Sequence, residues 1–264
     1  MKIKWAFIPA ISFCFVHCGI CRQIATNVPA IPETQKASGL PAGKTDTLSL
    51  FDTSRNRAVP VALYSESNAG KRTQKLVIIN HGYGAKNTAY SYIANNLAAY
   101  GYLVASIQHE MPGDEPMPAT GNIFETRKPY WQRGVENILF VIRELKKRRP
   151  DADYKNLVLI GHSNGGDMAM LFAHEYPGMV NLVISLDNRR MPFPRTKQPR
   201  IFSLRSSDQV ADPGVLPTPQ EQEQYNIRVV QLKNTIHNDM DDNGTNVQKQ
   251  EINSYILQFL ESNK

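Results

Sequence analysis

Cysteine is almost absent from this sequence. The chain has 264 residues and only three cysteines, Cys14, Cys18 and Cys21, all within its first 25 residues. If that segment is removed, the mature chain has no thiol, which excludes disulfides, a catalytic cysteine and cysteine metal ligands. A remaining chain of about 240 residues can bury a sufficient apolar core without disulfides.

The sequence also lacks a strong excess of charge of either sign. Lys and Arg number 30 and Asp and Glu number 24, for a net charge of +6. Lys2, Lys4 and Arg22 account for half of that excess, because no acid occurs before residue 26. The remaining excess of +3 gives no support to nucleic-acid binding.

Long apolar runs are missing as well. The longest one near the N-terminus, from Trp5 to about Phe15, follows Lys2 and Lys4 and is too short to span a membrane. We therefore predict a signal peptide at residues 1–25, followed by a linker at residues 26–45. The residues that precede Cys18 and Cys21 fit a lipoprotein signal poorly. The expected product is exported, periplasmic or secreted, with no stable membrane insertion after signal removal.

From residue 46 to residue 264, short apolar runs alternate with amphipathic ones, which indicates a single α/β domain. The predicted strands are Leu48–Phe51, Val59–Tyr64, Lys75–Asn80, Leu103–Ile107, Leu157–Ile160, Val183–Leu186, Ile201–Leu204 and Ile227–Leu232. The predicted helices are Tyr90–Tyr100, Val135–Lys147, Gly165–Tyr176 and Gln248–Leu260, the last beginning with a capping box of Thr245 and Gln248. This alternation predicts a mainly parallel eight-stranded sheet with helices on both faces.

The segment between Asp187 and Ile201 is too short for a separate lid domain. Any cover over a site must then come from residues 111–131, a Pro- and Met-rich stretch that we predict to be a long loop. In a parallel sheet the site is expected at the carboxyl ends of the strands.

One motif at such a strand end carries nucleophile chemistry. Gly161-His-Ser163-Asn-Gly165 is a Gly-x-Ser-x-Gly sequence between a predicted apolar strand and an amphipathic helix. A tight strand-to-helix turn projects the hydroxyl of Ser163, and only small residues fit beside it. The alternative is a Gly-rich turn without catalytic meaning, which the strand and helix on either side disfavour.

A serine hydroxyl needs a base to accept its proton, and a carboxylate to orient that base. His237 lies in a polar loop directly after the last predicted strand, and it is the histidine that gives the chain order Ser, acid, His. For the acid we favour Asp208, in the loop after Ile201–Leu204, with Asp187 at the end of the preceding strand as the alternative.

The same chemistry requires two backbone N–H groups aimed at the developing negative charge. We expect one from Asn164, just after the nucleophile. The other is expected from Tyr83, in the loop His81-Gly82-Tyr83-Gly84 after the third predicted strand. The two glycines allow the backbone of that loop to approach a substrate closely.

Together these residues resemble the α/β-hydrolase superfamily over residues 46–262. Within it the chain is most similar to exported dienelactone hydrolase-like and platelet-activating-factor acetylhydrolase-like serine esterases. The resemblance rests on Asp52–Tyr64, Asn80-His-Gly-Tyr-Gly84, Leu97–Glu110 and Gly161–Gly166. It implies a triad of Ser163, Asp208 and His237, with Tyr83 and Asn164 forming the oxyanion hole. After His109 the chain departs from that branch, because Glu110-Met-Pro stands where an Arg-Asp pair is common.

The resemblance implies a cofactor-free enzyme that cleaves a small-molecule carboxylic ester through an acyl-enzyme. The same machinery also serves peptidases and thioesterases, and a binding protein on an inactive hydrolase scaffold is a further alternative. We predict no metal site. Asp239–Gly244 copies the first half of a calcium loop, but Gln250 stands where the final Glu ligand is required, so a solvated turn is expected.

Overall fold

A computed structural model of the protein describes residues 43–66 and 73–261. The predicted signal peptide and nearly all of the predicted linker lie outside the described residues. In the part of the chain that is described, no helix is long and apolar enough to cross a membrane.

Eight strands form one sheet, in the order β1-β2-β4-β3-β5-β6-β7-β8. Strand β2 is antiparallel to both of its neighbours, and all other pairs are parallel. The strands are β1 (Gly43–Asp52), β2 (Arg57–Glu66), β3 (Lys75–Asn80), β4 (Leu103–Ile107), β5 (Asp153–His162), β6 (Leu182–Leu186), β7 (Arg200–Arg205) and β8 (Arg228–Gln231). The mainly parallel eight-stranded sheet predicted from the sequence is therefore confirmed, although β1 starts within the predicted linker.

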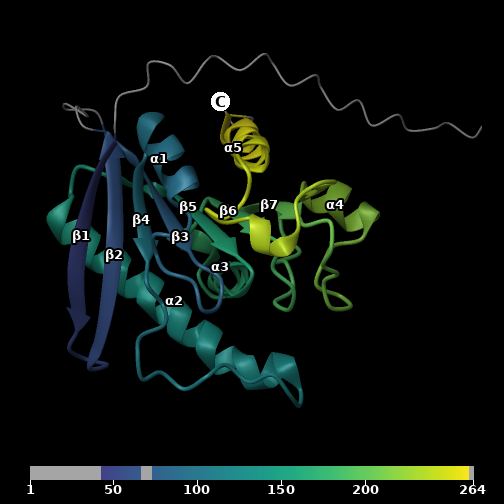
Figure 1. The fold of residues 1–264 in the computed structure, drawn as a ribbon, viewed down its shortest axis with the longest axis horizontal. Coiled ribbons are helices and arrows are strands. Elements are labelled where there is room, and N and C mark those ends of the chain that lie inside the picture. The colour runs from purple at the N-terminus through teal and green to yellow at the C-terminus, as the bar shows by residue number, and fades with distance from the viewer. Residues whose placement is uncertain (1–42, 67–72, 262–264) are drawn as a thin grey trace, which may run out of the picture. The chain divides into compact units, whose positions relative to one another are not determined.

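Helices cover both faces of the sheet (Figure 1). Helices α1 (Ser91–Ala99) and α5 (Asn246–Glu261) pack on one face, and α2 (Ile123–Arg148) and α3 (Asn164–Glu175) pack on the other. A short helix, α4 (Pro219–Tyr225), connects β7 to β8. The connection from β6 to β7 contains no helix or strand, and no separate lid is evident among the described residues.

Successive residues of the strands are apolar because both faces of the sheet are buried. In β3, Leu76 and Ile78 belong to the core under α2 and α3, whereas Val77 and Ile79 belong to the core under α1 and α5. All four side chains are at most 1% exposed. This two-sided burial holds the carboxyl ends of β3, β5, β6 and β8 at one edge of the sheet.

Helix α2 is longer than predicted. The sequence predicts a loop over residues 111–131, but the second half of that stretch is helical. The helix begins at Ile123, where the side chain of Asn122 accepts a hydrogen bond from the backbone of Glu125, and it continues through Pro129. Proline in a helix interior removes one backbone hydrogen bond, which is why the sequence pattern favours a loop here. Burial of Trp131, which is 0% exposed and packs edge-on against Phe124, offsets that loss.

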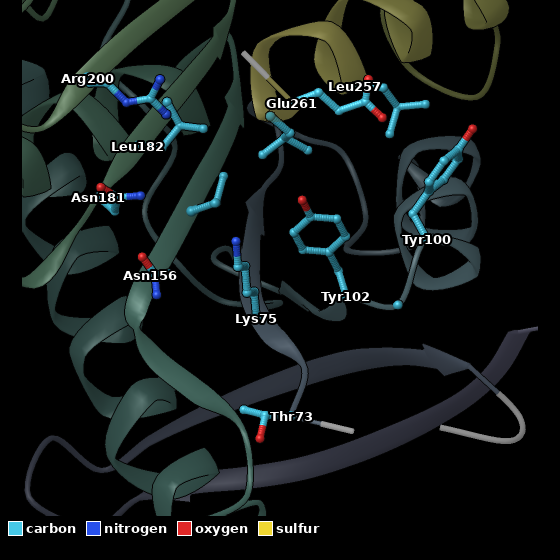
Figure 2. Close-up of a pocket in the computed structure, with 13 residues that line it drawn as sticks. Thr73, Lys75, Tyr100, Tyr102, Asn156, Asn181, Leu182, Arg200, Leu257 and Glu261 are labelled. Carbon is cyan, nitrogen blue, oxygen red and sulfur yellow. The ribbon is translucent and has the colours of Figure 1, made fainter. Parts of the chain in front are cut away.

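A cavity of about 240 Å³ opens at the edge of the sheet where the parallel strands begin (Figure 2). Lys75, Leu182 and Arg200, the first residues of β3, β6 and β7, line it together with Tyr102 and Glu261. The strands run away from this edge, so the cavity lies opposite the carboxyl ends that carry the predicted site residues.

Helix α1 receives its N-terminal cap from a distant part of the chain. The carboxylate of Asp242 accepts hydrogen bonds from the backbone N–H of Ser91 (3.1 Å) and of Tyr92 (3.1 Å), and from the Ser91 hydroxyl (2.7 Å). These contacts fix the segment after His237 against α1. The predicted capping box of α5 is also present, since Thr245 and Gln248 exchange hydrogen bonds between side chain and backbone.

We expect Asp242→Ala to lower the free energy of unfolding by about 1–2 kcal/mol, the usual cost of losing a helix cap with its hydrogen bonds. The matched control is Asp241→Ala, because the Asp241 carboxylate bonds to the neighbouring Asn243 and to no part of α1. Urea unfolding of both variants measures the difference. Equal losses for the two variants would contradict the capping role of Asp242.

Candidate active site

Ser163 occupies a sharp turn between β5 and α3, as its motif predicts. Its φ of 52° and ψ of −119° are unusual for a residue with a side chain. A Cβ on Gly161 would lie 2.2 Å from the carbonyl oxygen of Gly165, and one on Gly165 would lie 2.1 Å from that of Asn80. Only glycine fits at either position, so the two glycines of the motif allow this turn to form.

In the structure, the ring of His237 contacts the hydroxyl of Ser163. The histidine lies in a 3-10 turn, His237–Asp239, after β8, and its Nε2 is 3.0 Å from the Ser163 Oγ. Its other ring nitrogen, Nδ1, is 2.6 Å from Oδ2 of Asp187. The ring of His237 thus connects a hydroxyl and a carboxylate that come from the ends of β5 and β6.

The carboxylate on His237 belongs to Asp187, which corrects the favoured choice of Asp208. Asp208 is exposed, and its Oδ1 accepts a hydrogen bond from the backbone N–H of His237 (2.7 Å) rather than from the ring. Asp187 immediately follows β6, and Ser163 immediately follows β5, the strand next to it in the sheet. Both residues have a positive φ. Asp208 lies three residues beyond the end of β7, in a loop rather than at a strand end.

Asp187 is completely buried and has polar partners on both of its oxygens. Arg205 is 2.8 Å from Oδ1, which also accepts the backbone N–H of Ser206, and the Ser206 hydroxyl donates to Oδ2 (2.8 Å). Burial raises the pKa of Asp187, but the hydrogen bond to His237, the charge of Arg205 and the bonds from Ser206 outweigh burial and lower it overall. The carboxylate is therefore ionised at neutral pH.

This ionised carboxylate determines how the histidine ring is used. Because it can only accept, Nδ1 of His237 donates its N–H to Asp187. In a neutral ring Nε2 is then the acceptor, and the Ser163 hydroxyl donates to it. The arrangement allows His237 to take a proton from Ser163.

Two backbone N–H groups near Ser163 are available for an oxyanion. The N–H groups of Tyr83 and Asn164 have no hydrogen-bond partner among the residues that the structure describes. A Cβ on Gly82 would lie 3.5 Å from Cβ of Ser163, so the Tyr83 loop passes directly beside the nucleophile. These are the two groups that the sequence predicts as oxyanion donors.

The buried histidines near the site have structural partners. His162 pairs its Nδ1 with the hydroxyl of Tyr90 (2.7 Å), and burial together with the nearby His237 lowers its pKa to about 3. His81 accepts the backbone N–H of His109 at Nε2 (2.9 Å), and burial lowers the pKa of both rings. These three rings are neutral and support the loops around the site.

Sequence reasoning missed three residues that contact the site. Glu110 and Trp131 both bond to the side chain of Asn164, and Arg205 pairs with Asp187. Glu110 was noticeable in the sequence only as a departure from the common pattern after His109, and nothing local indicated the other two. All three reach the site from segments distant in sequence.

A metal site has no support within residues 43–66 and 73–261, where no group of three potential His, Cys, Asp or Glu ligands occurs. The calcium-like segment Asp239–Gly244 instead uses Asp242 to cap α1 and Asp241 to bond Asn243.

Two family models match parts of this chain, each over less than half of its length. A family model described as serine aminopeptidase, S33, matches residues 71–186, and one described as platelet-activating factor acetylhydrolase, isoform II, matches residues 20–121. A search of curated protein sequences found no match.

Several solved structures share the fold. A ferulic acid esterase from Streptomyces cinnamoneus is 20% identical, with a TM-score of 0.58 over 78% of this chain and 77% of that one. An esterase from Rhizomucor miehei is 12% identical, with a TM-score of 0.61 over 86% and 84% of the two chains. A dienelactone hydrolase-like promiscuous phosphotriesterase from metagenomic libraries is 13% identical, with a TM-score of 0.58 over 74% and 84%.

The fold is therefore that of the α/β-hydrolases, and the resemblance stated from the sequence is confirmed. Both matching family models describe hydrolases, and the solved structures that share the fold include esterases.

The position of the acid leads to a direct comparison of two variants. We expect Asp187→Asn to lower kcat on the order of 10⁴-fold, because an amide at this position favours the wrong tautomer of His237. Asp208→Asn, its matched control, should lower kcat less than about tenfold, because its contact is with the backbone. Hydrolysis of p-nitrophenyl acetate by folded samples measures both. A larger loss in Asp208→Asn would return the acid to the loop after β7.

The lowered pKa of Asp187 also predicts a pH-dependent stability. Because the pKa is lower in the folded protein than in the unfolded chain, the ionised form stabilises the fold above the ordinary aspartate pKa of about 3.9. That contribution is lost as the pH falls through the folded-state pKa. The wild type should therefore be more stable than Asp187→Asn at pH 6, and this difference should shrink as the pH falls from about 5 to below 3. Urea unfolding at each pH measures it, and a constant difference would contradict the assignment.

Proposed function

We propose that the chain cleaves small carboxylic esters through an acyl-enzyme on Ser163, with His237 as general base and Asp187 as the orienting acid. The observation that carries the proposal is the chain of two short contacts, 3.0 Å from Ser163 Oγ to His237 Nε2 and 2.6 Å from His237 Nδ1 to Asp187. A hydroxyl, an imidazole and a buried carboxylate in this order are the parts of a serine nucleophile and its base.

In the first step His237 takes the hydroxyl proton while the Ser163 oxygen attacks the ester carbonyl carbon. The carbonyl oxygen becomes an oxyanion, which accepts from the N–H groups of Tyr83 and Asn164. The imidazolium then gives its proton to the leaving alcohol, and the carbon–oxygen bond breaks to leave an acyl-serine. A water molecule then attacks the acyl-serine while His237 takes its proton, and the imidazolium returns that proton to the Ser163 oxygen as the carboxylic acid leaves.

Esters are favoured over amides and thioesters because the structural neighbours named above include esterases. The match of residues 71–186 to a serine aminopeptidase model keeps peptide hydrolysis as the second candidate. A panel of p-nitrophenyl esters of increasing chain length, beside aminoacyl p-nitroanilides and acyl thioesters, separates these activities by kcat/KM.

We also propose that residues 1–25 direct export and are removed. This rests on the sequence alone, on the two lysines followed by the short apolar run Trp5–Phe15. Mass spectrometry of the N-terminus after expression in a secreting bacterium tests it. A protein that retains Met1 in the cytoplasmic fraction would contradict the proposal.

The nucleophile has its own test. We expect Ser163→Ala to lower kcat by about 10⁴-fold or more, with a small residual rate from the oxyanion donors. A fluorophosphonate probe should label the wild type and the exposed-serine control Ser49→Ala, but not Ser163→Ala. Unchanged activity in Ser163→Ala would contradict the mechanism, and absence of labelling in the wild type would favour an inactive scaffold.

A further inference from the structure

The loop that carries the Tyr83 N–H is a tight turn of four residues. The carbonyl of Gly82 accepts a hydrogen bond from the N–H of Ala85 (3.1 Å), and Gly84 has a φ of +76°. The N–H of Gly82 donates to the hydroxyl of Tyr90 (3.1 Å). Because the Gly82 carbonyl and the Tyr83 N–H share one peptide plane, holding the first also sets the direction of the second.

The remaining amide of this turn is held by a residue without a role in the mechanism above. Glu110, which follows β4, accepts the N–H of Gly84 at Oε2 (2.7 Å). Its second oxygen, Oε1, lies 3.4 Å from the side-chain nitrogen of Asn164, the residue after the nucleophile. One carboxylate therefore contacts both segments that present N–H groups to the oxyanion.

Asn164 is held at both ends of its side-chain amide. Its Oδ1 accepts the indole N–H of Trp131 (2.8 Å), and its Nδ2 faces Glu110. Asn164 is 5% exposed and Trp131 is 0% exposed. Since Asn164 is the first residue of α3, these contacts orient the start of the helix whose first N–H faces the oxyanion.

The residues around Glu110 are themselves held by hydrogen bonds from Arg57 and Gln108. Arg57, on β2, binds both carboxylate oxygens of Asp114 (2.8 and 2.7 Å) and the carbonyl oxygen of His109 (2.7 Å). The side-chain amide of Gln108 donates to the carbonyl of Glu110 (3.1 Å). The segment that carries Glu110 is thus held by β2, and Gln108 also ties it to the Tyr83 turn through the carbonyl of Ala85 (3.3 Å).

The charge of Glu110 does not favour an oxyanion, so its benefit must come from geometry. Burial raises the pKa of Glu110, against the hydrogen bond from Gly84 and the charge of Arg133. A negative charge behind the oxyanion site repels the charge that develops there. An acceptor that only aligns the donors is needed, and a neutral amide keeps one such oxygen, enough for the Gly84 N–H but not also for the Asn164 amide.

We propose that Glu110 is a positioning residue that aligns the two oxyanion donors, because its carboxylate contacts the backbone N–H of Gly84 and the side chain of Asn164. The inference rests on the proposed function of the same site. Glu110 touches neither the nucleophile nor the base, and it acts through Tyr83 and Asn164.

The test compares three substitutions with a matched control on the same loop. Glu110→Ala and Glu110→Asp should lower kcat about 10–100-fold with KM changed less than about threefold, because small misplacements of oxyanion donors act on the transition state. Glu110→Gln keeps an oxygen for the Gly84 N–H and should retain kcat to within about fivefold of wild type. The control is Glu115→Ala, whose side chain is exposed and which should be indistinguishable from wild type.

A second measurement separates alignment from a general loss of structure. An aryl trifluoromethyl ketone forms a hemiketal with the nucleophile and places an oxyanion between the donors. Its Ki should rise in Glu110→Ala by the same factor as kcat/KM falls, whereas the Ki of the matching alcohol stays constant. Thermal unfolding is recorded in parallel, and Glu110→Asp supplies the comparison if the alanine variant does not fold.

Three results would overturn the inference. One is wild-type kcat and inhibitor affinity in both Glu110→Ala and Glu110→Asp, and another is an equal fall in affinity for the ketone and the alcohol. The third is an increase of kcat in Glu110→Ala and Glu110→Gln alike, which would mean that the carboxylate only repels the oxyanion.

If Ser163→Ala abolishes activity while the Glu110 variants behave normally, this inference fails and the proposed function stands. If the wild type itself is not labelled by the fluorophosphonate, the proposed function fails.

Discussion

The buried carboxylate of Asp187 is the point at which the separate parts of the site meet. It lies at the end of β6, pairs with Arg205 at the end of β7 and binds the ring of His237 after β8. Through that ring it is connected to Ser163 at the end of β5. An unpaired charge at this depth would be strongly destabilising, and here Arg205 forms an ion pair with the carboxylate while Ser206 and His237 hydrogen-bond to it. The same bonds keep it ionised, which the histidine requires.

The parallel sheet explains why these residues come together although they are far apart in the chain. Ser163 and Asp187 each come immediately after a buried strand and have a positive φ. At both positions the chain turns away from the sheet, and the side chain lies at the carboxyl end of the strand. Because β5 and β6 are neighbours with fixed register, the two side chains have little freedom relative to each other. His237 lies in a turn beyond the end of β8, where other contacts hold it. Asp208 holds its backbone N–H, and the Asp242 cap ties the residues after it to α1.

Features encoded by local sequence were predictable, and those that depend on distant contacts were not. The continuous apolar runs of the strands, the Gly-x-Ser-x-Gly turn and the position of His237 after the last strand all have local signals. Asp208 and Asp187 both follow strands, and only the three-dimensional path shows that Asp208 faces the backbone of His237 while Asp187 faces its ring. The start of α2 was missed because Pro129 is locally unfavourable, whereas burial of Trp131 is a tertiary effect. The contacts of Glu110 could not be predicted for the same reason, since Gly84 and Asn164 reach it from other elements.

The central claim is that Asp187 fixes the ring of His237 with Nδ1 protonated and Nε2 free to accept from Ser163. Nitrogen NMR of protein labelled with ¹⁵N-histidine at neutral pH tests this most directly, with the His237 signals assigned by their loss in His237→Gln. The account predicts that Nδ1 carries the proton in the wild type and in Asp208→Asn, and that Asp187→Asn loses this preference. A wild-type ring protonated at Nε2 alone, or a preference that disappears in Asp208→Asn and persists in Asp187→Asn, would contradict it.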